Sequence, residues 1–251
     1  MMLKSFLLVL IAVAAVNAHS GRVVGGTDAE EGEFPYIVSL RSSFGSHSCG
    51  GSILNNQWIL TAAHCVGAGA NGITIQYGVT KIDSSGPNVS KVSKVITHEK
   101  YSPSDNYRND IALLKLTEPI QFNDKVQPVK LPTQNQEFPH GTSSLLVGWG
   151  LDKSGGSIQK ILQKVDLIVF SDAECTSRHG GRTDSSQICG GVPEGWKGQC
   201  NGDSGGPMSV NGVQVGIVSW SVKPCTVPPY PGVYTKLSHF IDWVNEKISK
   251  N

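Results

Sequence analysis

A serine flanked by glycines is the residue of this chain whose chemistry is easiest to state. Ser204 lies in the hexapeptide GDSGGP at 202–207, where glycines hold a hydroxyl exposed and leave backbone N–H groups free to face a developing oxyanion. A hydroxyl is a weak nucleophile unless a base takes its proton, so an imidazole with an orienting carboxylate is needed. Taken alone, the hexapeptide also fits an ordinary surface loop.

Two other segments offer the base and the carboxylate. His64 lies in the run LTAAHC directly before Cys65, where a disulfide would hold the imidazole in place. Asp110 opens the apolar run DIALL, and a carboxylate at the head of a buried strand needs a partner because an unpaired buried charge is costly. A single histidine is usually an ordinary core or surface residue, so the hypothesis depends on all three segments together.

The elements that must position these residues are short strands. Glycine makes up 29 of 251 residues, or about 12%, against a usual share of ~7%. Gly, Pro, Asn and Ser separate apolar runs that recur throughout the chain. This pattern predicts one all-β unit, either a barrel, a sandwich or two packed barrels. Examples of the expected strands are 36–40, 73–77, 111–116, 145–147, 165–170, 213–218 and 233–235.

One helix is expected at the C-terminus. Ser238 is a candidate N-cap, and Ile241, Val244 and Ile248 follow at helical spacing on one face. We expect this apolar face to dock against the core and to have no function of its own.

The N-terminus has the pattern of a secretory signal. Lys4 precedes an uninterrupted apolar run at 6–16, and Val16 and Ala18 are the residues expected at a cleavage site. A membrane-spanning helix needs about 20 apolar residues, so a membrane anchor is the weaker interpretation. We expect residues 1–18 to be a signal peptide and the protein to be secreted, extracellular and not membrane-bound. Its six cysteines would then oxidise to three disulfides, with fifteen pairings open.

The charge is close to neutral. The chain has 21 Lys+Arg against 20 Asp+Glu, and removal of residues 1–22 would take away Lys4 and Arg22 and change +1 to −1. Nucleic-acid-binding domains normally carry a basic field, so no nucleic-acid partner is expected. The hydrophobic share of 39% against 16% charged residues is enough to bury a core and excludes an intrinsically disordered chain.

Together these segments resemble the trypsin/chymotrypsin family of secreted serine endopeptidases, and most closely its arthropod chymotrypsin-like members. The resemblance covers residues 23–251. Its motifs, in order, are VVGG (23–26), LTAAHC (60–65), DIAL (110–113), GWG (148–150), GDSGGP (202–207), VSW (218–220) and PGVY (231–234). It implies an all-β fold of two packed six-stranded antiparallel Greek-key barrels with a C-terminal helix and the active site between the barrels.

A different fold shares the string Gly-x-Ser-x-Gly. The α/β-hydrolase elbow needs an acid and then a histidine after the serine, together with strands that alternate with helices. Only His239 follows Ser204, no fitting acid lies between them, and the alternation is missing. We therefore set this alternative aside.

The resemblance implies a role for each candidate catalytic residue. Ser204 would attack the scissile carbonyl, His64 would act as base and then as acid, and Asp110 would hold the imidazole in its tautomer. The backbone N–H groups of Gly202 and Ser204 would form the oxyanion hole. A homologue that had lost part of this set would be a non-catalytic binding or regulatory protein, but all of it is present.

An extended edge for the substrate backbone is implied at Ser219, Trp220 and Ser221, where a peptide would pair as an added strand. The implied partners are protein or peptide substrates, an activating trypsin-like protease and protein protease inhibitors. We expect a monomer without a cofactor. Digestion is the expected role, with venom action, moulting and immune cascades as alternatives.

Specificity is where the chain departs from the best-known members. Trypsins carry an Asp six residues before the nucleophile, and here that position is Gly198. Ser221 and Gly232 are the other two lining positions, and because none is charged we expect a chymotrypsin-like preference for large apolar P1 residues. Ser221 and the neighbouring Gln199 could narrow the pocket, which leaves an elastase-like or mixed preference as the alternative.

The resemblance also implies activation from a zymogen. Residues 19–22 (HSGR) would be an activation peptide cut after Arg22, and the freed ammonium of Val23 would pair with Asp203 and order the oxyanion hole. His47 matches a family position that holds the same aspartate before activation.

The family pairing of the cysteines would be Cys49–Cys65, Cys175–Cys189 and Cys200–Cys225. No metal site is expected, because Val79 replaces the first carboxylate of the calcium loop found in some relatives, and Asp83 is left as a solvated turn residue. Asn88 begins the tripeptide NVS and is a candidate N-glycosylation site.

Overall fold

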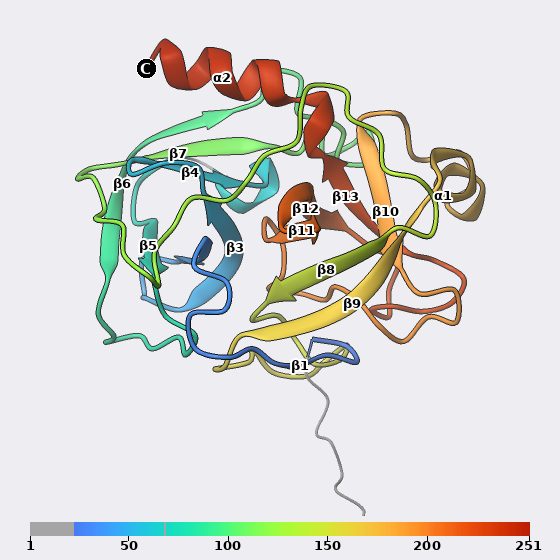
Figure 1. The fold of residues 1–251 in the computed structure, drawn as a ribbon, viewed down its shortest axis with the longest axis horizontal. Coiled ribbons are helices and arrows are strands. Elements are labelled where there is room, and N and C mark those ends of the chain that lie inside the picture. Colours follow the sequence, from blue (N-terminus) through green and yellow to red (C-terminus); the bar gives the residue numbers. More distant parts are fainter. Residues whose placement is uncertain (1–22, 68) are drawn as a thin grey trace, which may run out of the picture.

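The first half of the chain forms a closed antiparallel barrel. The structure is a computed structural model that describes residues 23–67 and 69–251, so the expected signal and activation peptides lie outside the described residues. The strands close in the order β2-β3-β4-β7-β6-β5 (Figure 1). Their bounds are β2 Ile37–Arg41, β3 His47–Ile53, β4 Trp58–Thr61, β5 Thr74–Tyr77, β6 Val89–Thr97 and β7 Ala112–Leu116.

The second half forms a second barrel beside the first (Figure 1). Its sheet runs β9-β10-β13-β12-β11-β8 and closes because β8 also pairs with β9, while the short strand β1 (Thr27–Asp28) joins the edge of β9. The bounds are β8 Ser143–Gly148, β9 Gln163–Phe170, β10 Gln187–Gly191, β11 Pro207–Val210, β12 Val213–Trp220 and β13 Gly232–Lys236. The expected pair of six-stranded antiparallel barrels is confirmed, and each of the seven exemplified runs overlaps a strand.

Each barrel is filled by the inward-facing apolar residues of its own strands. The first core includes Val38, Ile59 and Leu114, all fully buried. The second includes Leu146, Val215 and Tyr234. A third cluster joins the barrels, because Leu60 and Leu113 of the first pack with Ile217 of the second.

The C-terminal helix α2 (Ile241–Ser249) lies over β7 of the first barrel (Figure 1). Ile241 and Val244 are buried and Ile248 is partly buried in the cluster that joins the barrels, so the expected docking face is confirmed. The expected N-cap was wrong. Ser238 lies in a 3₁₀ turn, η2 (Leu237–His239), that is packed into the core, and α2 follows Phe240 without a side-chain cap.

A second helix, α1 (Asp172–Arg178), was not expected from the sequence. Ser171 caps it by accepting a hydrogen bond from the Glu174 backbone N–H at 3.2 Å. The spacing Ser-x-x-Glu is the capping signal that could have located it. Within the described residues, none of the helices is long and apolar enough to span a bilayer.

Candidate active site

The three candidate catalytic residues lie where the two barrels meet. His64 is on η1 (Ala63–Cys65), a 3₁₀ turn directly after β4, and Asp110 precedes β7, so both belong to the first barrel. Ser204 comes from the loop between β10 and β11 of the second barrel. His64 and Ser204 line one cleft of about 290 Å³.

Asp110 is a fully buried carboxylate with three hydrogen-bond donors. Oδ1 accepts from the His64 backbone N–H at 2.9 Å, and Oδ2 lies 2.7 Å from His64 Nδ1. Ser219 Oγ on β12 also donates to Oδ2 at 2.6 Å. These donors offset the cost of burying the charge, since an unpaired buried carboxylate would be strongly destabilising.

The carboxylate fixes the tautomer of His64. Because Asp110 Oδ2 accepts, Nδ1 carries the proton, and Nε2 is left as the nitrogen that can accept one. Ser204 Oγ makes no hydrogen bond within the described part of the chain, and such bonds in unliganded sites often form only with substrate in place. The Tyr107 ring packs edge-on against the imidazole, with centroids 5.7 Å apart.

The backbone around Ser204 presents two unpaired amides. Among the described residues, neither the Gly202 N–H nor the Ser204 N–H has a hydrogen-bond partner, whereas the Ser204 carbonyl accepts from Gly50 N at 2.7 Å. Gly202 has φ +94°, a conformation that favours glycine, and a Cβ there would lie 2.5 Å from Ile158 Cδ1. The loop therefore holds two N–H donors beside the Ser204 hydroxyl.

Asp203 points away from the cleft into the second barrel. Its oxygens accept from Gly150 N and Cys200 N, each at 2.9 Å, and a Cβ at Gly150 would collide with the carboxyl group. Burial raises the pKa of Asp203 to about 7, against the lowering effect of the two amides. Val23 is fully buried in the second core, and the carbonyl of Val24 accepts from Gly198 N at 3.1 Å.

His47 does not contact Asp203 in this structure. Its Nε2 donates to the Gly202 carbonyl at 2.9 Å, and its Nδ1 accepts from Ser39 Oγ at 2.7 Å. Burial lowers the pKa of His47 to about 4, so the imidazole is neutral at neutral pH. The arrangement thus differs from the aspartate-holding contact expected before activation, and His47 instead supports the residue that carries one of the unpaired amides.

The side chain of Gln199 crosses the pocket that was expected to receive the P1 side chain, here called the slot. Gln199 Nε2 donates to the Trp220 carbonyl at 2.6 Å, and a Cβ at Gly232 would lie 2.9 Å from Gln199 Cδ. The remaining cavity of about 10 Å³ is lined by Gln199, Ser221 and Gly232, among others. Gly198 is buried, with φ +140°, and a Cβ there would lie 3.3 Å from Thr226. The buried side chain of Gln199 thus lies between the Trp220 carbonyl and Gly232, beside this small cavity.

Comparison with known proteins agrees with this geometry. A family model described as Trypsin matches residues 23–244. The chain is 41% identical to serine protease 1 of Rattus norvegicus over 254 residues, 98% of this chain and 100% of that protein. It is 41% identical to trypsin-1 of Astacus astacus over 237 residues, 88% of this chain and 98% of that protein. It is 39% identical to trypsin II-P29 of Gallus gallus over 255 residues, 98% and 99% of the two chains.

The chain belongs to the trypsin family. It is a serine protease and therefore a hydrolase that acts on protein substrates, as the resemblance of its motifs implied.

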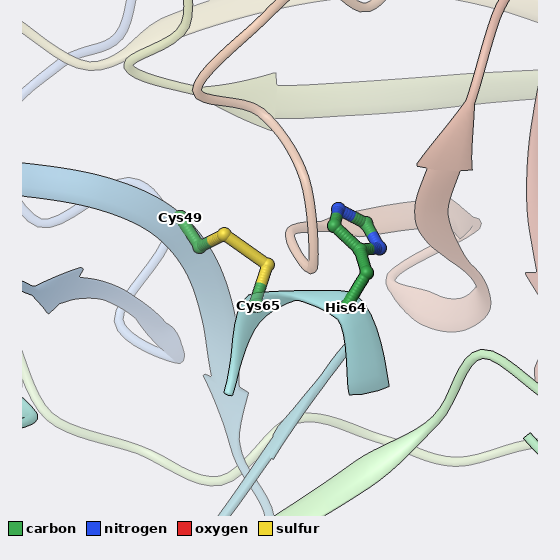
Figure 2. A group of neighbouring side chains, drawn as sticks. All are labelled: Cys49, His64 and Cys65. Carbon is green, nitrogen blue, oxygen red and sulfur yellow. A yellow bond between two sulfur atoms is a disulfide. The ribbon is translucent and has the colours of Figure 1, made fainter. Parts of the chain in front are cut away.

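Three disulfides brace this trypsin-family domain, and all six cysteines are used. They are Cys49–Cys65, Cys175–Cys189 and Cys200–Cys225, the pairing that the family resemblance implied. Figure 2 shows the first bridge leaving the same short turn as His64, so that the β3 strand and the histidine are tied together. Cys49, His64 and Cys65 also form a cluster with metal-ligand atoms, but both sulfurs are bonded to each other and are not available as thiolates.

Two surface positions singled out in the sequence lie apart from the cleft. Asp83 accepts hydrogen bonds from the backbone N–H and the hydroxyl of Ser85, at 3.0 and 3.1 Å, which is the geometry of a local turn. Asn88 is exposed, with φ 59°, directly before β6.

Sequence reasoning missed three contributors to the site. The hydroxyl of Ser219 bonds the Asp110 carboxylate, His47 bonds Gly202, and Lys223 lines the cleft. Ser219 was singled out only as part of the substrate edge and His47 only as the residue that holds Asp203. No local motif marks Lys223, because its position depends on how the loop after β12 folds back.

Proposed function

We propose that this trypsin-family chain is a secreted serine endopeptidase, made as a zymogen, that hydrolyses peptide bonds through an acyl-enzyme. Ser204 Oγ attacks the scissile carbonyl and its proton passes to His64 Nε2, while Nδ1–H stays bonded to Asp110. The oxyanion that forms is held by the N–H groups of Gly202 and Ser204. His64 then protonates the leaving amine. A water molecule, deprotonated in its turn by His64, attacks the acyl carbon; the bond to Ser204 Oγ breaks, and His64 returns the proton to that oxygen.

The observation that carries this proposal is the buried Asp110–His64 hydrogen bond next to a cleft that His64 shares with Ser204, together with the unpartnered amides of Gly202 and Ser204. The test is Ser204→Ala, measured on an amide substrate after cleavage behind Arg22. Activity should fall to the background left by the oxyanion hole and binding. A fully active variant would contradict Ser204 as the nucleophile, and a cleaved wild type that is inert on every peptide would favour a non-catalytic binding or regulatory protein instead.

We infer activation by a trypsin-like protease at Arg22–Val23. Two observations support it. Val23 is buried, and the Gly198 N–H donates a hydrogen bond to the Val24 carbonyl, so this segment lies against the loops of the slot. The new ammonium would pair with Asp203 and stabilise the loop that carries Gly202. Arg22→Gln should give a chain that such a protease cannot activate, while Lys250→Gln, an exposed change at the C-terminus, should activate normally.

For the primary specificity we propose an uncharged P1 residue, with a chymotrypsin-like preference for large apolar side chains. Gly198 stands where trypsins carry an aspartate, and the one charged residue that lines the cavity of the slot, within the described residues, is Lys197. A cationic P1 side chain would lose its hydration and meet a like charge there. The relatives named trypsins favour a trypsin-like preference for Lys or Arg at P1 instead, so a P1 profile that peaks at those residues would contradict the proposal.

Gln199 favours a second P1 preference, for small side chains. Its side chain occupies the slot between Trp220 and Gly232, so small P1 residues would fit without movement and large ones would require it to turn aside. Profiling of P1 on a peptide library decides between the two. Gln199→Ala should raise kcat/KM for Phe relative to Ala at P1 by about 10-fold or more, because one hydrophobic group in a pocket is worth that much. Gly232→Ala should lower kcat/KM for Phe relative to Ala at P1.

Secretion is proposed from residues 1–18, and Asn88 is proposed as a glycan site because it is exposed. Expression of the full chain in a secretory host, followed by N-terminal sequencing and glycosidase treatment, tests both. A cytosolic product that begins at Met1 would contradict the first, and an unchanged mass after glycosidase the second. Digestion of dietary protein remains the proposed role, with an activating protease and protein inhibitors as partners of the monomer.

A further inference from the structure

Lys223 is the charged side chain of the catalytic cleft. Among the described residues that line the cleft of His64 and Ser204, it is the sole Lys, Arg, Asp or Glu. Any charge preference that arises inside this cleft therefore depends on one ammonium group.

The ammonium has polar neighbours but no carboxylate partner. Nζ donates to Asn201 Oδ1 at 2.6 Å and lies 3.2 Å from Cys225 Sγ. Within the described part of the chain, no carboxylate oxygen forms an ion pair with it; Asp203 attracts it only from a distance and is held by Gly150 and Cys200. A cation in this position can still accept an anionic partner.

Lys223 lies beside the residues of the candidate substrate edge. It follows the edge at Ser219–Ser221 by two residues, and its partner Asn201 directly precedes Gly202. The disulfide Cys200–Cys225 joins the two segments that carry them. The residues of a substrate that precede the scissile bond, its acyl side, would pair along this edge. The ammonium therefore lies next to the part of the cleft that would bind them, called the acyl side of the cleft.

Two other cations border the same region. Lys197 lines the cavity of the slot, and the Arg182 guanidinium lies 5.7 Å from the centroid of the Trp220 ring. Three cations thus lie near the slot and the candidate substrate edge, although the chain without residues 1–22 carries a formal side-chain charge of −1.

We propose that Lys223 is a specificity-determining residue that favours peptide substrates with an Asp or Glu side chain on the acyl side, within a few residues of the scissile bond. The carboxylate would pair with Nζ, and Asn201 would keep the ammonium directed at it. The proposal rests on the proposed endopeptidase function, because the preference is expressed only through cleavage.

The test uses the activated full enzyme and matched peptides that share one P1 residue and carry Glu or Gln at P2, P3 or P4. At low salt, kcat/KM should be about two- to five-fold higher for Glu than for Gln at one of these positions, the range expected for an exposed ion pair. The ratio should approach one at roughly 0.5 M salt, because the interaction is screened.

Variants separate charge from structure. Lys223→Met should bring the Glu/Gln ratio to one, and Lys223→Glu should bring it below one, because two carboxylates then repel each other. Lys250→Met removes the same charge at the far C-terminus and should keep the wild-type ratio. Active-site titration, which counts the molecules that form the acyl-enzyme, confirms that each variant is folded.

Two results would overturn the proposal: equal rates for Glu and Gln peptides at all three positions, or an unchanged ratio in Lys223→Met. Failure of the wild type to cleave any peptide would instead contradict the endopeptidase function itself, so the two failures are distinguishable.

Discussion

Ser219 of the second barrel donates a hydrogen bond of 2.6 Å to the buried Oδ2 of Asp110 in the first barrel. The same oxygen lies 2.7 Å from His64 Nδ1, so one carboxylate oxygen receives donors from both barrels. The orientation of the imidazole therefore depends on how the two barrels are docked.

Loss of this contact should affect catalysis. A hydrogen bond to a charged group contributes about 1.5–3 kcal/mol, so Ser219→Ala should lower kcat by about 10- to 100-fold, while Asp110→Asn should lower it by about 10⁴ by favouring the wrong tautomer. Steady-state kinetics on one amide substrate measures both. Thr235→Val is the matched control, because Thr235 Oγ1 bonds only the main-chain oxygen of Asp110, at 2.8 Å. If Thr235→Val reduced kcat as strongly as Ser219→Ala, the carboxylate contact would not be the cause.

Asp203 should make the uncleaved chain less stable as pH rises. Burial raises its pKa to about 7, whereas an unfolded aspartate titrates near 3.8, so between these values the folded state binds more protons than the unfolded state. The free energy of unfolding then falls with increasing pH across that window. Asp203→Asn should flatten the dependence, as measured by urea unfolding of the Ser204→Ala precursor. The exposed change Asp166→Asn should leave the slope as it is, and an equal slope in Asp203→Asn would be contrary evidence.

His47 should make the chain less stable as pH falls, the opposite pH dependence to that of Asp203. Burial lowers its pKa to about 4 from 6.5, so as pH falls through this range the unfolded chain takes up a proton that the folded chain refuses. Stability attributable to His47 is therefore lost as pH falls from about 6.5 to about 4. His47→Gln should remove this loss, again measured by urea unfolding, whereas His140→Gln at the surface should not. A steeper acid limb in His47→Gln than in the wild type would contradict the sign.

The Cys49–Cys65 disulfide should contribute to both stability and activity. It closes a separation of 16 residues, for which chain entropy predicts about 3 kcal/mol, and its second cysteine adjoins His64. The double variant Cys49→Ser/Cys65→Ser should lose that stability and also activity. Cys175→Ser/Cys189→Ser, with a separation of 14 residues, should lose similar stability and retain kcat. Thermal unfolding and kinetics at a temperature where both variants are folded distinguish the two effects.

The pieces of the site could be predicted from sequence because each is a short local string. LTAAHC, DIAL and GDSGGP need no knowledge of the fold to be noticed. The contact between Ser219 and Asp110 joins residues 109 apart in the chain, and the course of Gln199 across the slot depends on Trp220 and Gly232. Such contacts arise from packing, on which local patterns carry little information.

Strand β3 shows why some elements escaped notice. Its sequence HSCGGSI has little β propensity, yet a Cβ at Gly50 would lie 2.9 Å from Gly206 Cα and one at Gly51 would lie 2.9 Å from the Leu60 carbonyl. The glycines are there because neighbouring backbone approaches closely, and the strand is stabilised by its partners. Ser238 shows the converse, since a good capping residue is buried in η2 before the helix begins.

The bond from Gly50 N to the Ser204 carbonyl has a consequence for biosynthesis. Gly50, His64 and Asp110 leave the ribosome well before Ser204, and the nucleophile loop gains its support only when the later barrel has closed against the earlier one. A nascent chain with only the first barrel formed would contain His64, the proposed base, without Ser204, the proposed nucleophile. We therefore expect the candidate site to be assembled only after both barrels have formed, and hydrolysis, on the proposed zymogen activation, to begin later still, after cleavage behind Arg22.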